Sequence, residues 1–495
     1  MTLTTGSTAT AATPGHTALV YMQEHADLSQ QARMPRGAER RQATWDQLVA
    51  TAERTQAPLQ QLIDELIADQ KVESARSIPL INAIAVTLTS PAGDSSSNAV
   101  LDALRGASAV ASVVTDADLS VPEPARDAAA GVSQVTRPVT GAGTALPGAT
   151  RNTVQPDAGV AWGVAKIGAP AAWSTGITGK GVTVGLVDSG LDASHEGVKA
   201  AYRGTQADGS QQHDYNWIDT AGYDNGDFVP VPYDSDGHGT HVAGTVAGGT
   251  DTHKIGVAPD AKFIVAKMGA ENYLADAISA VRALQFMLAP TKVDGTAPDP
   301  SKGVDIVNNS WGIDKHYRPA VQGALDALKA AGIVVVNAAG NEGEAGVQGT
   351  VQDVPGSLPG HLSVAATTRR DKVPEWSSVG PSPFNDKVGD TPTLAAPGDQ
   401  ILSAEIAGGY AAYGGTSVAA PHVTGAVALM LQANPQATNE QIRDALQSTA
   451  TDIDRRGPDY ASGAGRINAD QAVDAIRALA HTRAEATQAQ RVRHN

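Results

Sequence analysis

The sequence predicts an α/β fold in which a parallel, doubly wound sheet carries helices on both faces and follows a small α+β unit. Beyond about residue 160, continuous apolar runs such as GVTVGLV (181–187) and GIVVVNAA (332–339) alternate with amphipathic helical patterns such as 320–332. This alternation is typical of a parallel sheet covered on both faces. The length of 495 residues also favours more than one folded unit.

The N-terminal part has its own pattern of short strands and helices. Strand-like runs are expected at 16–23, 81–90 and 111–121, and helical runs at 42–72 and 96–106. Pro58 is expected to interrupt the longer helix, because proline lacks the amide hydrogen that a helix interior uses. We therefore predict a small α+β domain over residues 1–122.

Composition sets the remaining boundaries. Residues 123–158 are rich in Pro, Gly, Ala and Thr and lack apolar periodicity, which predicts a linker. The α/β domain is expected over 159–480, and the polar segment 481–495 is expected to form a frayed tail. Within the α/β domain, strands are expected at 181–187, 261–268, 304–311 and 332–339, and helices at 274–288 and 320–332.

Charge and cysteine content exclude several classes of function. The formal net charge of −16 argues against a nucleic-acid partner, because phosphate binding needs a basic face. The chain has no cysteine, so disulfides, thiol catalysis and cysteine-based zinc sites are ruled out. No apolar run approaches the ~18 residues of a membrane-spanning helix, so no membrane partner is expected.

Three polar residues stand where apolar strands end or helices begin, which is where ligands gather in parallel sheets. Asp188 ends an apolar run, His238 opens HGTHVAGTVAG, and Ser417 lies in GGTSVAAPHVTGAVALML. In a serine-nucleophile interpretation, Ser417 attacks a carbonyl, His238 takes its proton, and Asp188 orients the imidazole. Asn341, just past a strand, would donate to the oxyanion together with the Ser417 amide.

Each residue also has a simpler interpretation. A strand-end Asp often forms a turn, and a Ser before a helix often caps it. His238 and His241 could instead form a metal-ligand pair, because residues i and i+3 share a helix face. No H-E-x-x-H pattern and no third carboxylate at helical spacing accompany them, which disfavours the metal. The joint occurrence of Asp, His, Asn and Ser therefore favours catalysis.

The blocks VDSGLDASH, HGTHVAGT, VNNSWG, AAGNEG and GTSVAAPHVTGAVAL resemble the diagnostic blocks of subtilisin-like serine proteases (subtilases, peptidase family S8), in the family's order over 162–476. Flanking stretches such as KIGVAPDAKFIVAK resemble the bacillopeptidase F-like group. The resemblance implies a subtilisin-type sheet and a serine endopeptidase that cleaves protein or peptide substrates through an acyl-enzyme. It implies catalytic Asp188, His238 and Ser417 and the oxyanion donor Asn341, with His241 and His422 as packed helix residues.

The N-terminal unit resembles a subtilase propeptide through INAIAVTLT and LRGASAVASVVTDADLSV. This resemblance implies a self-processing zymogen whose propeptide is an intramolecular inhibitor until it is cut in or near the linker. Family habit implies an extracellular protein. No charged n-region or apolar h-region of a signal peptide is seen, so a cytoplasmic location stays the alternative. Two other classes are disfavoured. An inactive subtilase acting as a binding module would not require all four residues, and an aspartic protease would need a second D-S/T-G.

The resemblance also implies the substrate-binding residues. Two short segments are expected to form opposite walls of the pocket for the P1 side chain: Ser310, Trp311 and Gly312 on one side, and Ala338, Ala339 and Gly340 on the other. The small residues are expected to leave room for a sizeable apolar P1 side chain, with Glu342 near the rim.

Two departures from the family pattern concern calcium and oxidation. No metal ligand is assigned and no cofactor is expected to be required, because Gly197 stands where subtilisins often have a calcium-binding Asp and the loop GTDTHKIGVAP is short. The acidic residues 219–236 are expected to form a solvated loop, with calcium binding as the alternative. Val418 follows the nucleophile where many members have methionine, so sensitivity to oxidation is expected to be missing there.

Overall fold

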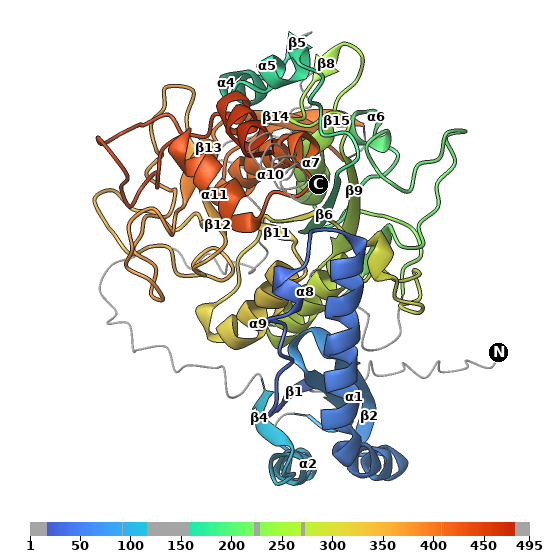
Figure 1. Cartoon of the computed structure of the whole chain (residues 1–495). Coiled ribbons are helices and arrows are strands. Elements are labelled where there is room, and N and C mark those ends of the chain that lie inside the picture. Colours follow the sequence, from blue (N-terminus) through green and yellow to red (C-terminus); the bar gives the residue numbers. More distant parts are fainter. Residues whose placement is uncertain are drawn as a thin grey trace, which may run out of the picture. The chain divides into compact units, whose positions relative to one another are not determined.

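The computed structural model describes residues 17–91, 93–115, 159–221, 228–268, 273–406 and 408–480. The chain divides into two compact units: Met1–Ala26 with Val49–Ala129, and Asp27–Leu48 with Ala130–Asn495 (Figure 1). The expected linker 123–158 and tail 481–495 lie outside the described residues. No helix in the described part of the chain is long and apolar enough to span a bilayer.

The first unit is a small α+β domain, as predicted. Its four antiparallel strands lie in the order β2-β3-β1-β4. The strands are β1 (Thr17–Met22), β2 (Val72–Ile78), β3 (Ala83–Leu88) and β4 (Val110–Thr115); the helices are α2 (Ser95–Arg105) and the part of α1 (Ala38–Ala68) that begins at Val49. Leu59, Ile63 and Leu66 of α1 join the buried core of this sheet, because their spacing places them on one helix face.

Two expectations for this unit were wrong. Helix α1 continues through Pro58 instead of breaking there. Ala52 before the proline and Leu59 after it are both buried, so packing on both sides outweighs the roughly 3 kcal/mol cost of an interior proline. Strand β2 was missed because VESARSI is buried only at its two ends and shows no apolar alternation. It is an edge strand, where polar residues are ordinary.

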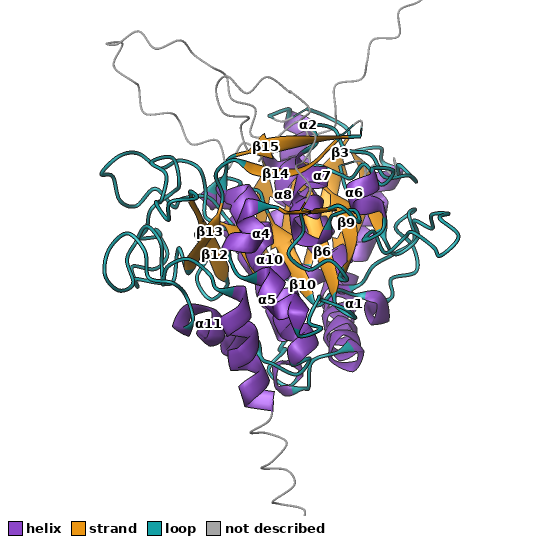
Figure 2. Ribbon diagram, turned by 90° about the horizontal axis from the view of Figure 1, so that it is seen from above, coloured by secondary structure: helices purple, strands orange, loops and turns teal. Residues whose placement is uncertain are grey.

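The second unit is built on a seven-stranded parallel sheet in the order β13-β12-β11-β10-β6-β9-β7, with its strands drawn in orange in Figure 2. The strands are β6 (Thr183–Asp188), β7 (Trp217–Asp219), β9 (Lys262–Lys267), β10 (Ile306–Asn309), β11 (Val334–Ala338), β12 (Leu362–Thr367) and β13 (Leu394–Pro397). The four strands predicted for this domain correspond to β6, β9, β10 and β11. The predicted fold class is therefore confirmed.

Helices cover both faces of this sheet. They are α7 (His238–Ala247), α8 (Tyr273–Leu288), α9 (Arg318–Ala330) and α10 (Thr416–Ala433). Along β6, Val184 belongs to the core cluster that contains α10, whereas a Cβ on the next residue, Gly185, would lie 2.2 Å from Met287 Sδ of α8. Successive strand residues point to opposite faces, so α10 and α8 lie on opposite sides, as Figure 1 also shows.

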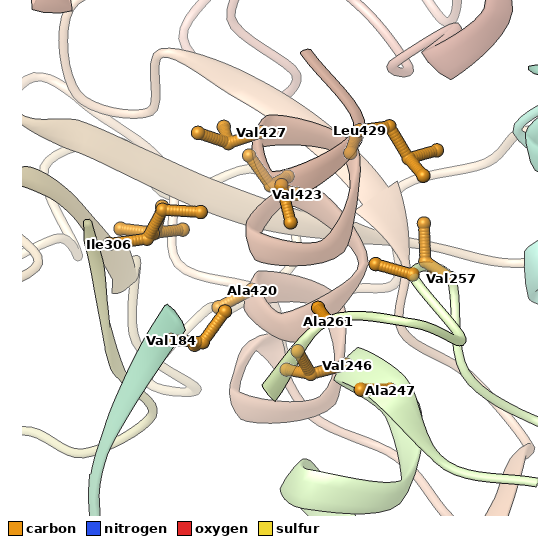
Figure 3. Close-up of a cluster of buried hydrophobic side chains, with 14 of the residues drawn as sticks. Val184, Val246, Ala247, Val257, Ala261, Ile306, Ala420, Val423, Val427 and Leu429 are labelled. Carbon is orange, nitrogen blue, oxygen red and sulfur yellow. The ribbon is translucent and has the colours of Figure 1, made fainter. Parts of the chain in front are cut away.

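Helix α10 is the centre of the core. All its residues from Thr416 to Leu431 are buried, so it is a core helix and not an amphipathic surface helix. Figure 3 shows Ala420 and Val423 facing Val184 and Ile306 of the sheet, with Val246 of α7 on another side. The position of α10 is therefore set by packing against both the sheet and α7.

Shorter elements complete the second unit. Among the described residues, further helices are α4 (Trp162–Lys166), α5 (Ala169–Ser174), α6 (Glu196–Lys199) and α11 (Asn439–Ser448), and residues 469–480 are also helical. The remaining strands are the parallel pair β5 (Gly159–Val160) and β8 (His253–Lys254) and the hairpin β14 (Ile401–Glu405) and β15 (Gly409–Tyr413). In the part of the chain that the structure describes, 3₁₀ turns lie at η1 (Gln31–Arg33), η2 (Pro79–Ile81), η4 (Pro300–Lys302) and η5 (Lys315–Tyr317).

Arginines hold the segment Asp27–Leu48 within the second unit. Arg40 Nε donates to the carbonyl of Ala330 at the end of α9 at 2.7 Å, and Arg36 Nε donates to the carbonyl of Ala437 at 3.1 Å. Carbonyls in the last turn of a helix have no partner within the helix, so Arg40 satisfies one of them. The segment therefore groups with the parallel-sheet unit although it precedes most of the first unit in sequence.

Candidate active site

Asp188 ends β6 at the point where the strand order of the sheet reverses. From β6 the chain builds β7 and β9 on one side and then β10 to β13 on the other. Ligands bind outside the carboxyl ends of the strands at such a switch point. Asp188 and the segments that follow β10 and β11 therefore lie along one edge of the sheet.

His238, the first residue of α7, is joined to Asp188. Its Nδ1 donates to Asp188 Oδ1 at 2.6 Å, and the side chains of Asp188 and His238 are only 3% and 4% exposed. Burial by itself lowers the pKa of His238, but the Asp188 carboxylate outweighs it and raises this pKa above the ordinary value. An imidazole held in this way keeps Nε2 for a second partner.

A network that sequence analysis missed holds His238 at the start of α7. The Asp234 carboxylate accepts from the amides of Gly237 at 3.0 Å and Thr240 at 2.8 Å, so it satisfies donors that the first turn leaves free. Ser189 Oγ donates to Asp234 at 2.8 Å and accepts from the Gly239 amide at 2.9 Å. The available signal was an Asp just before a helix start, which is typical of capping.

Close backbone contact explains one glycine pair at this point. Gly190 has φ +136°, and a Cβ there would lie 2.0 Å from the carbonyl oxygen of Tyr233. A Cβ on Gly239 would lie 2.2 Å from the carbonyl oxygen of Gly190. Only glycines allow the loop after β6 to approach α7 this closely, and the approach brings Asp188 to His238.

Ser417 and Asn341 border a common space at the start of α10. A Cβ on Gly415 would lie 2.9 Å from Ser417 Oγ and 3.6 Å from Asn341 Nδ2. Asn341 Oδ1 accepts from the Thr416 amide at 2.8 Å, which turns its Nδ2 toward this space. The hydroxyl of Ser417 therefore lies beside an amide donor at a helix N-terminus, where a developing negative charge is stabilised.

Two atoms of this site are buried and lack a partner. His238 Nε2 and Ser417 Oγ form no hydrogen bond with any described residue, including each other. These are the two atoms between which a proton would pass in a serine-nucleophile reaction. Catalytic hydrogen bonds of this kind often form only when substrate is bound.

The six residues expected to bind substrate have different environments. Ser310 Oγ donates to the carbonyl of Ser417 at 2.6 Å, so this side chain holds the α10 start. Ala338 and Ala339 are buried, as is Trp311, whose Nε1 has no partner among the described residues. Of the six residues, this leaves Gly312 and Gly340 as the ones expected to line the two walls of the P1 pocket.

A carboxylate lies close to each of the two wall glycines, and one of these carboxylates, Glu342, was expected near the rim. A Cβ on Gly312 would lie 3.6 Å from Asp353 Oδ2, and a Cβ on Gly340 would lie 2.4 Å from Glu342 Oε2. Asp353 was not identified by sequence analysis, because nothing in its local sequence links it to Gly312.

The other histidines of this region are structural. His241 is fully buried, and its Nε2 donates to the carbonyls of Ile401 at 3.0 Å and Ala411 at 3.2 Å. Burial lowers the pKa of His241 to about 3, so the ring is neutral. His422 Nδ1 bonds the carbonyl of Val418 within α10 at 2.9 Å. The two histidines of HGTH thus have separate partners, a carboxylate for His238 and backbone carbonyls for His241.

The residues present do not fit the usual subtilisin calcium site. Position 197 has no side chain to act as a ligand, and a Cβ there would lie 3.1 Å from Tyr410 Oη and 3.2 Å from the His195 ring, so a carboxylate would require both side chains to shift. The short loop after α7 is instead closed by backbone pairing, in which Thr250 N donates to the carbonyl of His253 at 2.8 Å. Across the described residues, no group of three or more His, Asp or Glu side chains is arranged to hold a metal ion. Part of the acidic segment, 222–227, lies outside those residues.

Comparison with known proteins agrees with this geometry. A family model described as the Subtilase family matches residues 179–465. Bacillopeptidase F of Bacillus subtilis (strain 168) is 35% identical over 341 residues, which are 66% of this chain and 23% of that protein. Subtilisin NAT of Bacillus subtilis subsp. natto is 34% identical over 318 residues, which are 63% of this chain and 71% of that protein.

The subtilisin of Bacillus pumilus is also 34% identical over 318 residues, which are 98% of that protein. The chain therefore spans less than a quarter of bacillopeptidase F but most of the shorter subtilisins. The family match covers more than half of the chain and includes all four residues of the site. The chain belongs to the subtilase family of subtilisin-like serine peptidases.

Proposed function

We propose that the chain is a serine endopeptidase that hydrolyses peptide bonds of proteins through an acyl-enzyme at Ser417. The observation that carries the proposal is the buried bond of 2.6 Å between Asp188 and His238, which leaves His238 Nε2 without a partner, while Ser417 Oγ at the start of α10 is also buried and without a partner among the described residues. Asp188 and His238 thus supply an oriented base, and Ser417 supplies a nucleophile at a helix start.

Each residue then has one role. His238 Nε2 takes the proton of Ser417 as Oγ attacks the scissile carbonyl, and returns it to the leaving amine. Asp188 keeps the proton of His238 on Nδ1 and stabilises the imidazolium that forms. Asn341 Nδ2 and the Ser417 amide donate hydrogen bonds to the oxyanion. The acyl-enzyme is hydrolysed when water, activated by the same imidazole, attacks the ester carbonyl. No cofactor takes part in these steps.

We extend the proposal to the N-terminal unit, which would act as an intramolecular inhibitor and be removed by self-processing between the two units. The support is a separately packed α+β unit ahead of the protease unit and a Pro- and Gly-rich connection over 123–158. The proposed setting is extracellular, as the family resemblance implies.

The test is labelling and intact mass of the purified full-length chain over time. A fluorophosphonate probe should label Ser417, casein should be degraded, and a fragment ending in 123–158 should be released. A chain that neither reacts with the probe nor degrades casein would contradict the peptidase proposal and favour a binding module. A labelled, active chain that is never processed would contradict only the zymogen proposal.

Asn341→Ala should lower kcat by about 10²–10³-fold with little change in KM, a loss that was measured in subtilisin itself. The amide donates to charge that exists in the transition state and not in the substrate carbonyl, so the effect belongs in kcat. Steady-state kinetics on a peptide p-nitroanilide separates the two constants. A changed KM with unchanged kcat would place Asn341 in substrate binding instead.

Activity should survive hydrogen peroxide. Val418, directly after Ser417, is fully buried, and a methionine there would gain a polar sulfoxide oxygen next to the nucleophile. Residual activity after peroxide treatment is the measurement, with Val418→Met as the matched variant. The wild-type chain should keep its activity and the variant should lose it. If both chains lost activity equally fast, resistance to peroxide could not be attributed to Val418.

Removing calcium should leave stability unchanged, since position 197 has no side chain to act as a ligand. A tight site would add about 4 kcal/mol at 1,000 times its Kd, and thus on the order of 10 °C in Tm. Thermal unfolding of the Ser417→Ala chain in EDTA and in excess calcium makes the comparison without self-digestion. A calcium-dependent rise of that size would contradict the expectation and point to residues 219–236.

A further inference from the structure

The two carboxylates that face the pocket walls are held in place by the fold. Ile313 and Val354 form an antiparallel bridge, with Ile313 N donating to the Val354 carbonyl at 2.9 Å and Val354 N donating back at 2.9 Å. This bridge fixes the neighbouring residues Gly312 and Asp353 against each other, with a Cβ on Gly312 lying 3.3 Å from Asp353 Cβ. Asp353 is thus fixed by backbone pairing at the first wall.

Glu342 is fixed at the second wall by a buried serine. Ser378 Oγ lies 3.1 Å from Glu342 Oε2, to which it donates, and accepts from the Glu342 amide at 3.1 Å. These bonds fold the Glu342 side chain back over Gly340, where a Cβ would lie 2.4 Å from Oε2. Glu342 is exposed to solvent at its outer side, so it stands nearer the mouth of the pocket than Asp353.

The two wall segments follow neighbouring strands of the sheet, and one of them contacts the start of α10. Asn309 of β10 and Asn337 of β11 are paired in register, and Gly312 and Gly340 each follow three residues later. The Gly340 amide donates to Thr416 Oγ1 at 3.1 Å, next to the nucleophile. Ser417 Oγ, which is buried and without a partner among the described residues, therefore lies one residue from a contact of the second wall.

The negative charge of the Asp353 carboxylate is not balanced by a directly bonded positive group among the described residues. No described group donates a hydrogen bond to the Asp353 carboxylate, and Lys315, the cation that acts on it, is bonded to Gln352 Oε1 at 2.9 Å. Burial raises the pKa of Asp353 to about 7, with further increases from the negative charges of Glu342 and Asp314 and an opposing effect of Lys315. A partly buried carboxylate that accepts no hydrogen bond is stabilised by a cation brought by the ligand.

We propose that the pocket beside Ser417 selects a cationic P1 side chain, Lys or Arg, which pairs with Asp353 at the base and with Glu342 near the mouth. This inference rests on the proposed function, because it concerns the substrate of the same site. A carboxylate in the P1 pocket is also how trypsin selects basic residues, on an unrelated fold. Because both wall residues are glycines, no wall side chain stands between the backbone and the carboxylates of Asp353 and Glu342.

The test compares peptides that differ only in P1. The full-length chain, with active sites counted by fluorophosphonate titration, is assayed on succinyl-Ala-Ala-Pro-Xaa-p-nitroanilides with Lys, Arg, Phe or Glu as Xaa. We expect kcat/KM to be at least about 10-fold higher for Lys and Arg than for Phe, and lowest for Glu. Faster cleavage after Phe than after Lys would overturn the inference and leave the proposed function intact. Failure to cleave any of the four peptides, without probe labelling, would overturn both.

Single substitutions test which carboxylate sets the preference for Lys over Phe at P1. Asp353→Asn should lower the Lys-to-Phe ratio of kcat/KM by about 30-fold, the low end for removing one partner of a buried charge pair. Glu342→Gln, at the exposed mouth, should lower it only a few-fold. Glu344→Gln removes an exposed carboxylate two residues further on and is the matched control, with an unchanged ratio. An unchanged ratio in Asp353→Asn that still reacts with the probe would overturn the role of Asp353.

Two further readouts keep the role of Asp353 testable if Asp353→Asn folds poorly. Asp353→Lys should reverse the preference and admit Glu at P1. In the wild-type chain the Lys-to-Phe ratio should rise between pH 6 and pH 8 as Asp353 ionises under the influence of Glu342, Asp314 and Lys315. Both substrates use His238, so its own titration cancels from the ratio. A ratio independent of pH would contradict pairing with Asp353.

Discussion

Ser417→Ala is expected to lower kcat by about 10⁶-fold, the size of loss measured when the nucleophile of subtilisin is removed. The hydroxyl is the atom that forms the acyl-enzyme, and no other described side chain at the start of α10 replaces it. Residual hydrolysis would come from the oxyanion donors and substrate binding alone. The variant should also fail to react with a fluorophosphonate probe and should keep its full-length mass.

The measurement is casein hydrolysis together with intact mass, with Ser174→Ala as the control. Ser174 is an exposed serine in the same unit whose hydroxyl donates to the carbonyl of Ala171. Its replacement should leave activity and processing unchanged. If Ser417→Ala kept more than a small fraction of the activity, Ser417 would not be the nucleophile. If both chains were cut alike, the cutting would come from another protease.

Asp188→Asn is expected to lower kcat by about 10⁴-fold, the loss found for the equivalent change in trypsin. The amide of Asn can donate to His238 Nδ1, which leaves the proton on Nε2, where the Ser417 proton has to be accepted. The fold should tolerate the change because Asp and Asn have nearly the same shape. The loss should therefore appear in kcat and not in protein yield.

The pH profile distinguishes this role from a merely structural one. Asp188 raises the pKa of His238, and the base works only when deprotonated, so wild-type activity should rise as pH increases through that pKa. Without the carboxylate the pKa of His238 falls, and the remaining activity should reach its plateau at lower pH. Asp192→Asn, which affects only a carboxylate bonded to Ser194, is the control. An unshifted profile in Asp188→Asn would contradict the pairing.

Sequence patterns predicted the central sheet because its strands are continuous apolar runs. Strands β6, β9, β10 and β11 were found in this way, whereas β13 (Leu394–Pro397) is only four residues long and carries no periodic signal. The proline in α1 was misjudged because the cost of a local feature was weighed without the packing on either side of it. Local propensity is a weak guide wherever tertiary contacts act on the same residues.

The site could be predicted in part, for a related reason. Asp188, His238, Asn341 and Ser417 each lie in a recognisable local block, so sequence analysis named them before their geometry was known. Asp353 could not be found in this way, because its importance comes from a bridge between Ile313 and Val354, two segments far apart in the chain. Chemistry carried by a motif is visible in sequence, whereas selectivity set by a loop-to-loop contact is not.

The burial of α10 constrains how this chain can change over evolutionary time. The same side chains, among them Ala420, Val423 and Val427, both hold the core together and fix the position of Ser417. A substitution that leaves a void there would lower stability and displace the nucleophile together. Tolerated variation along this helix should therefore be limited to swaps of similar volume, and adaptation to new substrates should occur in the loops after β10 and β11.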